Sequence, residues 1–198
     1  MSEVCLLGGM SRLHDDVIAR VTAFVPVTPD EVLARQRTLT FLADHPDGVE
    51  ATCQAGHVTA TALLLTPDRR RTLLTLHGRI KRWIELGGHL EPDDADLAAA
   101  SLREGIEESG IPGLTQEPGI LTVVVHEDLP CRRAPGTIHY DVYYVLTAPE
   151  GGQERISDES LDLGWFDVDA LPEPLGDGVA EVLELALSRY PARTAAAR

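Results

Sequence analysis

The chain has 198 residues, of which 43% are hydrophobic and 25% charged, and its formal net charge is −15 at pH 7. This length allows one domain with a sizeable core plus an extension, and the composition excludes a disordered chain. Because an acidic surface repels phosphate backbones and anionic lipids, we expect neither nucleic acid nor a membrane as a partner. An anionic substrate would need a recruited positive group, such as a divalent cation.

The cysteines bear on the cellular compartment. Cys5, Cys53 and Cys131 are odd in number and widely spaced, which excludes a disulfide framework or a zinc ribbon and suits a reducing environment. The opening MSEVCLLGGM lacks the basic and apolar regions of a signal peptide. No apolar run approaches the roughly 20 residues needed to span a bilayer. We therefore expect a cytoplasmic protein.

Residues 1–55 show helical patterning. Apolar residues recur at helical spacing in the ranges 13–24 and 31–43, and Thr28 or Asp30 can cap the second helix. We expect a helical extension here, with three roles open. It can cap a cleft, mediate a homodimer, or pack against the rest of the chain.

From His57 onward the pattern becomes strand-like. The runs HVTATALLL and RTLLTLH, separated by the turn TPDRR, predict a β-hairpin. Four later ranges are predicted strands: 82–86, 119–127, 137–146 and 161–166. Helices are predicted from Asp94 or Asp96 to Ser109 and from Val179 to Arg189, before a loose tail at 191–198. This order predicts an α/β domain over 56–190, with a mixed sheet between helical layers.

The central predicted helix carries an acidic cluster. Glu104, Glu107 and Glu108 are spaced by three and four residues, so all three point to one side of the helix. Like charges at this spacing destabilise a helix by roughly 0.2–0.5 kcal/mol per pair. Arg103, four residues before Glu107, can orient that carboxylate. Clustered carboxylates of this kind suit Mg²⁺ or Mn²⁺, and a merely solvated acidic face is the alternative.

Three aspartates precede this helix. Asp93, Asp94 and Asp96 lie where an aspartate caps a helix and interacts favourably with its dipole. We favour capping over metal binding for all three. An EF-hand loop is excluded, because its glycine and closing glutamate are not at the required offsets.

The segment GGHLEPDDADLAAASLREGIEESGI, residues 87–111, resembles the Nudix box of the Nudix hydrolase family. That pattern is Gly, five residues, Glu, seven residues, Arg-Glu, a hydrophobe, any residue, Glu-Glu, any residue, Gly and a hydrophobe. The Arg-Glu pair, the Glu-Glu pair and the closing Gly-Ile are present. Three features depart from it: Asp94 replaces glutamate, eight residues precede Arg103, and Gly105 occupies the hydrophobic slot.

These departures leave the three glutamates in place. A glycine inside a helix costs about 1 kcal/mol relative to alanine, and Gly105 removes a packing side chain from the face opposite the carboxylates. We expect lower stability without loss of the metal. The extra residue falls at the entry to the helix, where an insertion costs least.

The resemblance extends over residues 56–190. The strands before the box, together with HYDVYYVLTA and ESLDLGWFDVDALP after it, are similar to those of the family in the same order. The resemblance implies a Nudix-type α/β/α sandwich, here with an N-terminal helical extension. It also implies hydrolysis of a nucleoside diphosphate linked to another moiety.

The resemblance further implies the roles of the box residues. In the family, one to three divalent cations bridge the box glutamates and the diphosphate. By position, Glu107 and Glu108 are the central metal ligands, Glu104 is a further ligand or polarises water, and the carbonyl of Gly88 joins the shell. The cations neutralise the diphosphate and lower the pKa of a bound water that attacks phosphorus.

The general base in this family is a box glutamate or a glutamate on a later loop. Glu159, in the polar segment SDES before Trp165, is our candidate for the later-loop glutamate. Its neighbour Asp158 is a competitor. An exposed loop acid without a catalytic role is the structural alternative.

Residues outside the helix are candidate substrate contacts. Arg82 and Trp83 precede the box, and His89 follows the glycine pair, where it can approach the diphosphate. Strand alternation in HYDVYYV puts His139 and Asp141 on one face, which suits a strand that lines a cleft. Three of these residues have a non-functional alternative: a basic surface turn for Arg82, a core position for Trp83 and a structural role for His139.

Two functions compete. The first is an Mg²⁺- or Mn²⁺-dependent diphosphohydrolase acting on a small molecule, and the second is a catalytically weak or inactive Nudix-fold binding or regulatory module. The intact glutamate trio favours the enzyme. Nucleotide sugars, ADP-ribose, dinucleotides, oxidised nucleotides and other metabolite diphosphates all remain open as substrates.

Overall fold

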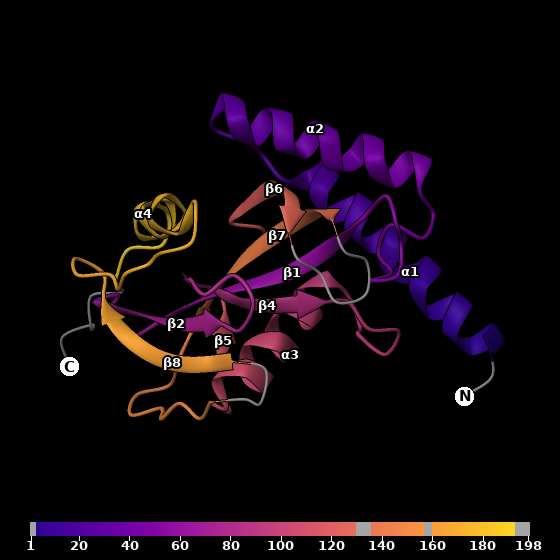
Figure 1. Cartoon of the computed structure of the whole chain (residues 1–198). Helices are drawn as coiled ribbons and strands as arrows, with labels where there is room; N and C mark the ends of the chain where they lie inside the picture. The colour runs from indigo at the N-terminus through magenta and orange to yellow at the C-terminus, as the bar shows by residue number, and fades with distance from the viewer. Residues whose placement is uncertain (1–2, 130–135, 157–159, 193–198) are drawn as a thin grey trace.

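Helices cover both faces of a mixed β-sheet in the computed structural model, which describes residues 3–129, 136–156 and 160–192. The helices among these residues are α1 (Glu3–Ala23), α2 (Pro29–Asp44), α3 (Leu97–Ser109) and α4 (Val179–Arg189). The strands are β1 (Gly56–Leu65), β2 (Arg71–His77), β3 (Trp83–Ile84), β4 (Leu86–His89), β5 (Thr115–Gln116), β6 (Thr122–Leu129), β7 (Thr137–Thr147) and β8 (Ser160–Asp167). Figure 1 shows α3 and α4 on opposite sides of the strands.

Strand β1 is the centre of the sheet. It pairs in parallel with β7 along its full length, and on its other edge it pairs antiparallel with β4 and β2. Outside these, β3 and β8 pair with β2, while β5 and β6 pair with β7. One parallel pair within an otherwise antiparallel sheet makes it mixed, as the sequence predicted.

Side-chain alternation along β1 separates two apolar layers. Ala62 and Leu64 belong to the cluster that packs under α3, whereas Leu63 and Leu65 belong to the cluster under α4. The sheet is therefore buried on both faces, which is the predicted α/β/α sandwich.

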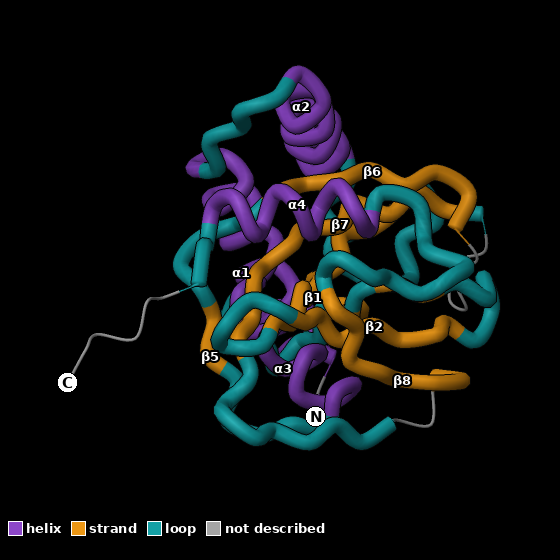
Figure 2. The backbone as a smooth tube through the Cα atoms, turned by 90° about the vertical axis from the view of Figure 1, so that its left-hand side faces the viewer, coloured by secondary structure: helices purple, strands orange, loops and turns teal. Residues whose placement is uncertain are grey.

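The N-terminal helices pack against this sandwich. Phe41 of α2 stacks on Tyr140 of β7, with ring centroids 4.3 Å apart, and Val17 of α1 shares an apolar cluster with Ala100 of α3. Figure 2 shows α2 lying beside β6. Helices α1 and α2 thus share a core with the sheet, while the domain boundary at residue 55 stays a prediction. Within the described part of the chain, no helix combines the length and apolar character needed to cross a membrane.

Polar contacts fix α1 at the start of α3. The Asp16 carboxylate accepts a hydrogen bond from the backbone N–H of Leu97 at 2.9 Å. Arg20 joins Asp16, at 2.8 Å, to Asp96, at 2.7 Å. The N-terminal extension therefore helps to set the position of the central helix.

Several predicted boundaries differ from the structure: α1 begins at Glu3, ten residues before the predicted start at 13, and β6 begins at Thr122 instead of 119. Thr28, one of the two predicted caps, caps α2 and forms a capping box with Glu31. The predicted strand 82–86 is instead two short strands, and the glycine pair lies inside the second, β4. Gly87 (φ 148°) permits this, because a Cβ there would lie 2.7 Å from the carbonyl oxygen of Ala60 in β1.

Gly105 lies at the closest approach of α3 to the sheet. It is buried, and a Cβ built on it would overlap Cδ1 of Leu146 in β7 and lie 3.4 Å from the Cβ of Ala62 in β1. The expectation that Gly105 leaves a packing position empty is therefore wrong. The Leu146 side chain already fills that space, so glycine is what lets the helix pack so closely.

This packing predicts the effect of Gly105→Ala. Higher helix propensity should contribute about 1 kcal/mol, but overpacking against Leu146 should cost about 1–3 kcal/mol. We expect a net loss of about 1 kcal/mol in the free energy of unfolding, measured by urea denaturation. In a Leu146→Val background, which lacks the overlapping methyl group, the same substitution should become neutral or stabilising. Equal effects in the two backgrounds would contradict the packing argument.

Candidate active site

The ends of α3 are defined by flanking residues. The Asp96 carboxylate caps the helix by accepting a hydrogen bond from Ala99 N at 2.8 Å, and Gly110 ends it in the left-handed conformation at φ 67°. The capping prediction is confirmed for Asp96. It is wrong for Asp94, whose buried carboxylate pairs with Arg103 instead.

Arg103 links the entry loop, strand β4 and two of the box glutamates. Its guanidinium donates to both carboxylate oxygens of Asp94, at 2.8 and 3.0 Å, and to the carbonyl of His89 at 2.9 Å. It also donates to Glu104 at 2.8 Å and to Glu107 at 3.0 Å, the contact predicted from the spacing. These protein partners hold the guanidinium in place, so Arg103 is suited to orient carboxylates.

Two glutamates of α3 lie against the glycine pair of β4. A Cβ built on Gly88 would lie 2.7 Å from the carboxylate carbon of Glu104. Next to it, the backbone N–H of Gly87 donates to the Glu108 carboxylate at 2.9 Å. The missing side chain of Gly88 therefore leaves room for the Glu104 carboxylate, and the backbone N–H of Gly87 positions the Glu108 carboxylate.

The environments of the three glutamates differ. The Glu104 side chain is 13% exposed and that of Glu107 is 59% exposed, so the predicted acidic face is only partly solvated. Burial raises the pKa of Glu104 to about 7, although the neighbouring Arg103 lowers it and Glu107 raises it further. Carboxylate and carbonyl oxygens make this a hard donor set, which fits Mg²⁺ or Mn²⁺.

Three predicted site residues lie away from this cluster or outside the described residues. Arg82 is exposed and donates to the carbonyl of Leu175, before α4, at 2.8 Å. Trp83 is half-buried and packs edge-to-face on Phe166, with centroids 4.7 Å apart, which agrees with its core alternative. Glu159 and its neighbour Asp158 lie outside the described residues.

His139 and Asp141 share the sheet face opposite α3. Both are buried, at 9% exposure, so this part of β7 does not present the open cleft that the alternation suggested. His126 donates to the Asp141 carboxylate at 2.6 Å, and the hydroxyl of Thr59 donates to the other oxygen. Burial raises the pKa of Asp141, but the hydrogen bonds with His126 and Thr59 and the charges of His126 and His139 together outweigh it, so the pKa is lowered.

Glu85 is a buried carboxylate that the sequence patterns did not indicate. It lies between β3 and β4, and its Oε1 has no hydrogen-bond partner among the described residues. Burial raises its pKa to about 7; the nearby Asp141 raises it further and His126 lowers it. The only sequence signal was an acid between Ile84 and Leu86 in an otherwise apolar strand segment.

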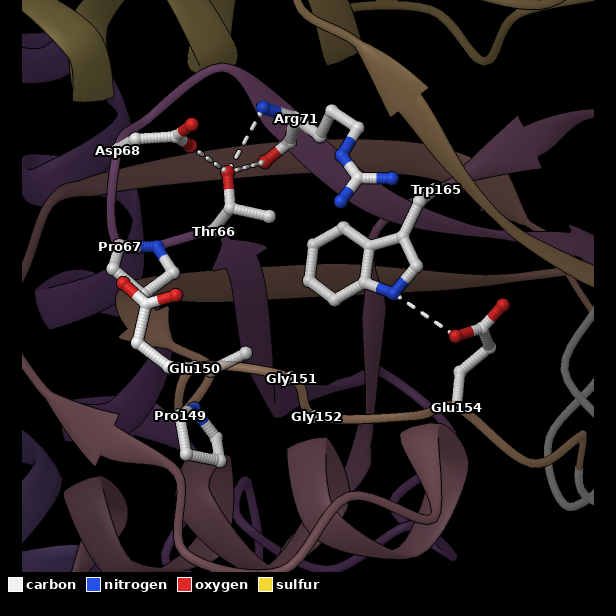
Figure 3. A pocket seen from close by; sticks show the side chains of 11 residues that line it. Thr66, Pro67, Asp68, Arg71, Pro149, Glu150, Gly151, Gly152, Glu154 and Trp165 are labelled. Carbon is white, nitrogen blue, oxygen red and sulfur yellow. Dashed lines mark hydrogen bonds between the residues drawn. The ribbon is translucent and has the colours of Figure 1, made fainter.

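A cavity of about 330 Å³ opens at the far end of the hairpin (Figure 3). The indole N–H of Trp165 donates to Glu154 at 3.0 Å there, and Arg71 lies 5.9 Å from the Trp165 ring. Asp68, Glu150 and Glu154 also line it, and no box glutamate does. Because no box glutamate lines it, the cavity is separate from the carboxylate cluster.

The sequence matches a known family model. The model described as "NUDIX domain" matches residues 55–186. A search of curated proteins finds no matching relative.

Solved structures share the fold. A hydrolase of the NUDIX family from Clostridium perfringens is 21% identical, with a TM-score of 0.52, over 65% of this chain and 97% of its own. A C. elegans Ap4A hydrolase is 18% identical, with a TM-score of 0.55, over 67% and 96%. A UDP-X diphosphatase is 17% identical, with a TM-score of 0.51, over 93% and 95%, so that match also includes most of the N-terminal extension.

The buried Glu85 predicts a pH dependence of stability. The Glu85 carboxyl keeps its proton up to about pH 7 in the folded state but only up to about pH 4.5, the ordinary pKa of a glutamate, in the unfolded state, so stability should fall as pH rises through this window. Glu85→Gln removes this loss, and its stability relative to wild type should rise by up to about 3 kcal/mol from pH 4 to pH 8. Denaturation at both pH values measures this. The exposed Glu184→Gln is the control, and an equal difference at both pH values for Glu85→Gln would contradict the prediction.

Proposed function

Because the chain belongs to the Nudix family of hydrolases, we propose that it catalyses divalent-metal-dependent hydrolysis of a diphosphate linkage. The proposed substrate is a nucleoside diphosphate linked to another moiety, or a related organic diphosphate. The observation that carries this proposal is the placement of Glu104 and Glu108 against Gly88 and Gly87, with Arg103 beside them.

The donor set supports Mg²⁺ or Mn²⁺ as the cofactor. Glu104, Glu107, Glu108 and the carbonyl of Gly88 would hold the ion through oxygen atoms alone. A cation bound there neutralises diphosphate oxygens and lowers the pKa of a coordinated water. It also places positive charge at the site itself, where the net charge of −15 otherwise opposes the approach of an anionic substrate.

Side chains of the chain itself would position the metal-binding carboxylates and activate the attacking water. Arg103, held by Asp94, keeps the Glu104 carboxylate at the strand. Because burial raises the pKa of Glu104 to about 7, this carboxylate is suited to polarise a water near neutral pH. Glu159 stays our proposed general base on the later loop.

Substrate contacts are proposed for five residues outside the helix. His89 lies beside the glycine pair and Arg103 binds its carbonyl, although strand alternation directs its side chain to the face of β4 away from Glu104. Arg82, Trp83, His139 and Asp141 stay proposed contacts, although the structure gives each a protein partner or a buried position. The inactive-module alternative rested on the irregular box, and the close packing at Gly105 accounts for its main irregularity.

The direct test is hydrolysis of a panel of diphosphates with Mg²⁺ or Mn²⁺. Wild type should release phosphate or nucleotide only with the metal. Glu107→Gln should reduce the rate by about 100-fold or more, because it removes a carboxylate that acts in the transition state. The exposed Glu184→Gln on α4 is the matched control and should keep the wild-type rate. A wild type without metal-dependent product, or a fully active Glu107→Gln, would overturn the proposal.

Gly88→Ala tests the contact between strand and helix. A methyl group would lie 2.7 Å from the Glu104 carboxylate, so that flexible side chain should move aside. We expect at least about tenfold lower activity with less than about 1 kcal/mol lost in stability, since only a side-chain end shifts.

The same substitution in a Glu104→Gln background gives the control. If Gly88→Ala acts by displacing Glu104, it should add little once that carboxylate is gone. Independent, multiplicative losses in the double variant would contradict this explanation.

A further inference from the structure

Three histidines meet on the sheet face opposite α3. His57 of β1 lies directly opposite His139 of β7, and His89 of β4 pairs with Thr59, two residues along β1 from His57. A side chain on Gly88 would face Glu104, so strand alternation directs His89 to the other face. The histidines therefore come from three adjacent strands of the rigid sheet.

Their ring nitrogens converge. One nitrogen from each of His57, His89 and His139 lies within 4.8 Å of the other two, and the Nε2 atoms of His57 and His89 are 3.2 Å apart. In a tetrahedral zinc shell with Zn–N distances of about 2.0–2.1 Å, two ligand nitrogens are separated by roughly 3.4 Å. One pair thus already has the separation of two ligands on a metal, and side-chain rotation can bring in the third.

Two of the three rings, those of His57 and His139, are kept neutral, the form that binds metal. Burial, followed by the neighbouring His139 and His89, lowers the pKa of His57 to about 4, and burial also lowers the pKa of His139. The Nε2 atom of His139 is buried and has no hydrogen-bond partner among the described residues. A buried nitrogen of this kind calls for a water or an ion.

A nearby carboxylate, that of Asp141, can balance the positive charge of a cation bound by the histidines. Asp141 acts electrostatically on both His57 and His139, while its oxygens are bonded to Thr59 and His126. It is therefore placed to offset charge from outside the ligand shell, as carboxylates often do around metal-bound histidines.

We propose that His57, His89 and His139 form a second metal site, for a borderline divalent ion such as Zn²⁺. Three imidazole ligands leave the fourth tetrahedral position to water. Nitrogen ligands select Zn²⁺ and similar transition metals, whereas the box carboxylates select Mg²⁺ or Mn²⁺. The two sites lie on opposite faces of β4, and this site does not depend on the proposed hydrolase activity.

The experiment titrates the full-length, untagged protein with Zn²⁺ by calorimetry and with Co²⁺ by visible absorption. We expect one equivalent of Zn²⁺ and the absorption bands of tetrahedral Co²⁺. His89→Gln and His139→Gln should each weaken Zn²⁺ binding by at least about tenfold. Thermal unfolding without metal shows that each variant folds, and added Zn²⁺ should raise the Tm of wild type more than that of His89→Gln.

Three matched variants separate this site from others. His126→Gln changes a histidine on the neighbouring strand, His45→Gln changes one near Cys53, and Glu107→Gln changes the carboxylate cluster. All three should keep the high-affinity Zn²⁺ equivalent. Loss in any of these with retention in His89→Gln, or wild type with no Zn²⁺ equivalent and no tetrahedral Co²⁺ bands, would overturn the proposal.

Discussion

The close approach of α3 to the sheet is the constraint on which the site depends. At Gly88 a side chain would meet the Glu104 carboxylate, and at Gly105 it would meet Leu146. Gly88 on the strand therefore leaves space for the Glu104 carboxylate, and Gly105 on the helix leaves space for the Leu146 side chain of the core. The distance between the two elements thus sets both the packing and the position of the glutamates.

Polar contacts fix the helix along its own axis. Asp16 and Arg20 of α1 hold the first turn, and Arg103 ties the helix to the loop before it through Asp94. Forming these hydrogen bonds costs little additional conformational entropy, because packing in the core already orders the groups that make them. The N-terminal extension therefore contributes to the candidate active site without supplying any of its proposed ligands.

Local rules predicted much of this fold from the sequence. The cap at Thr28, one of two candidates, the hairpin between β1 and β2 and the bounds of α4 all follow from short-range patterns. The Arg103–Glu107 contact also depends only on helical spacing. Such features involve residues a few positions apart, so a single sequence contains the information needed.

The rest depended on distances between elements. From the sequence, Gly105 was expected to remove a packing side chain, because the residues of the helix do not reveal how closely it approaches the sheet. Glu85 and the three converging histidines become visible only when the parallel register of β1 and β7 and the position of β4 are known. Strand order brings these residues together, and no motif records it.

The central claim is that the carboxylates packed against β4 hold a divalent cation. Titration of the metal-free protein with Mn²⁺, followed by electron paramagnetic resonance, measures this without a substrate. We expect Mn²⁺ binding to be at least about tenfold weaker in Glu108→Gln and unchanged in Glu184→Gln. Equal Mn²⁺ affinity in wild type and Glu108→Gln would contradict it.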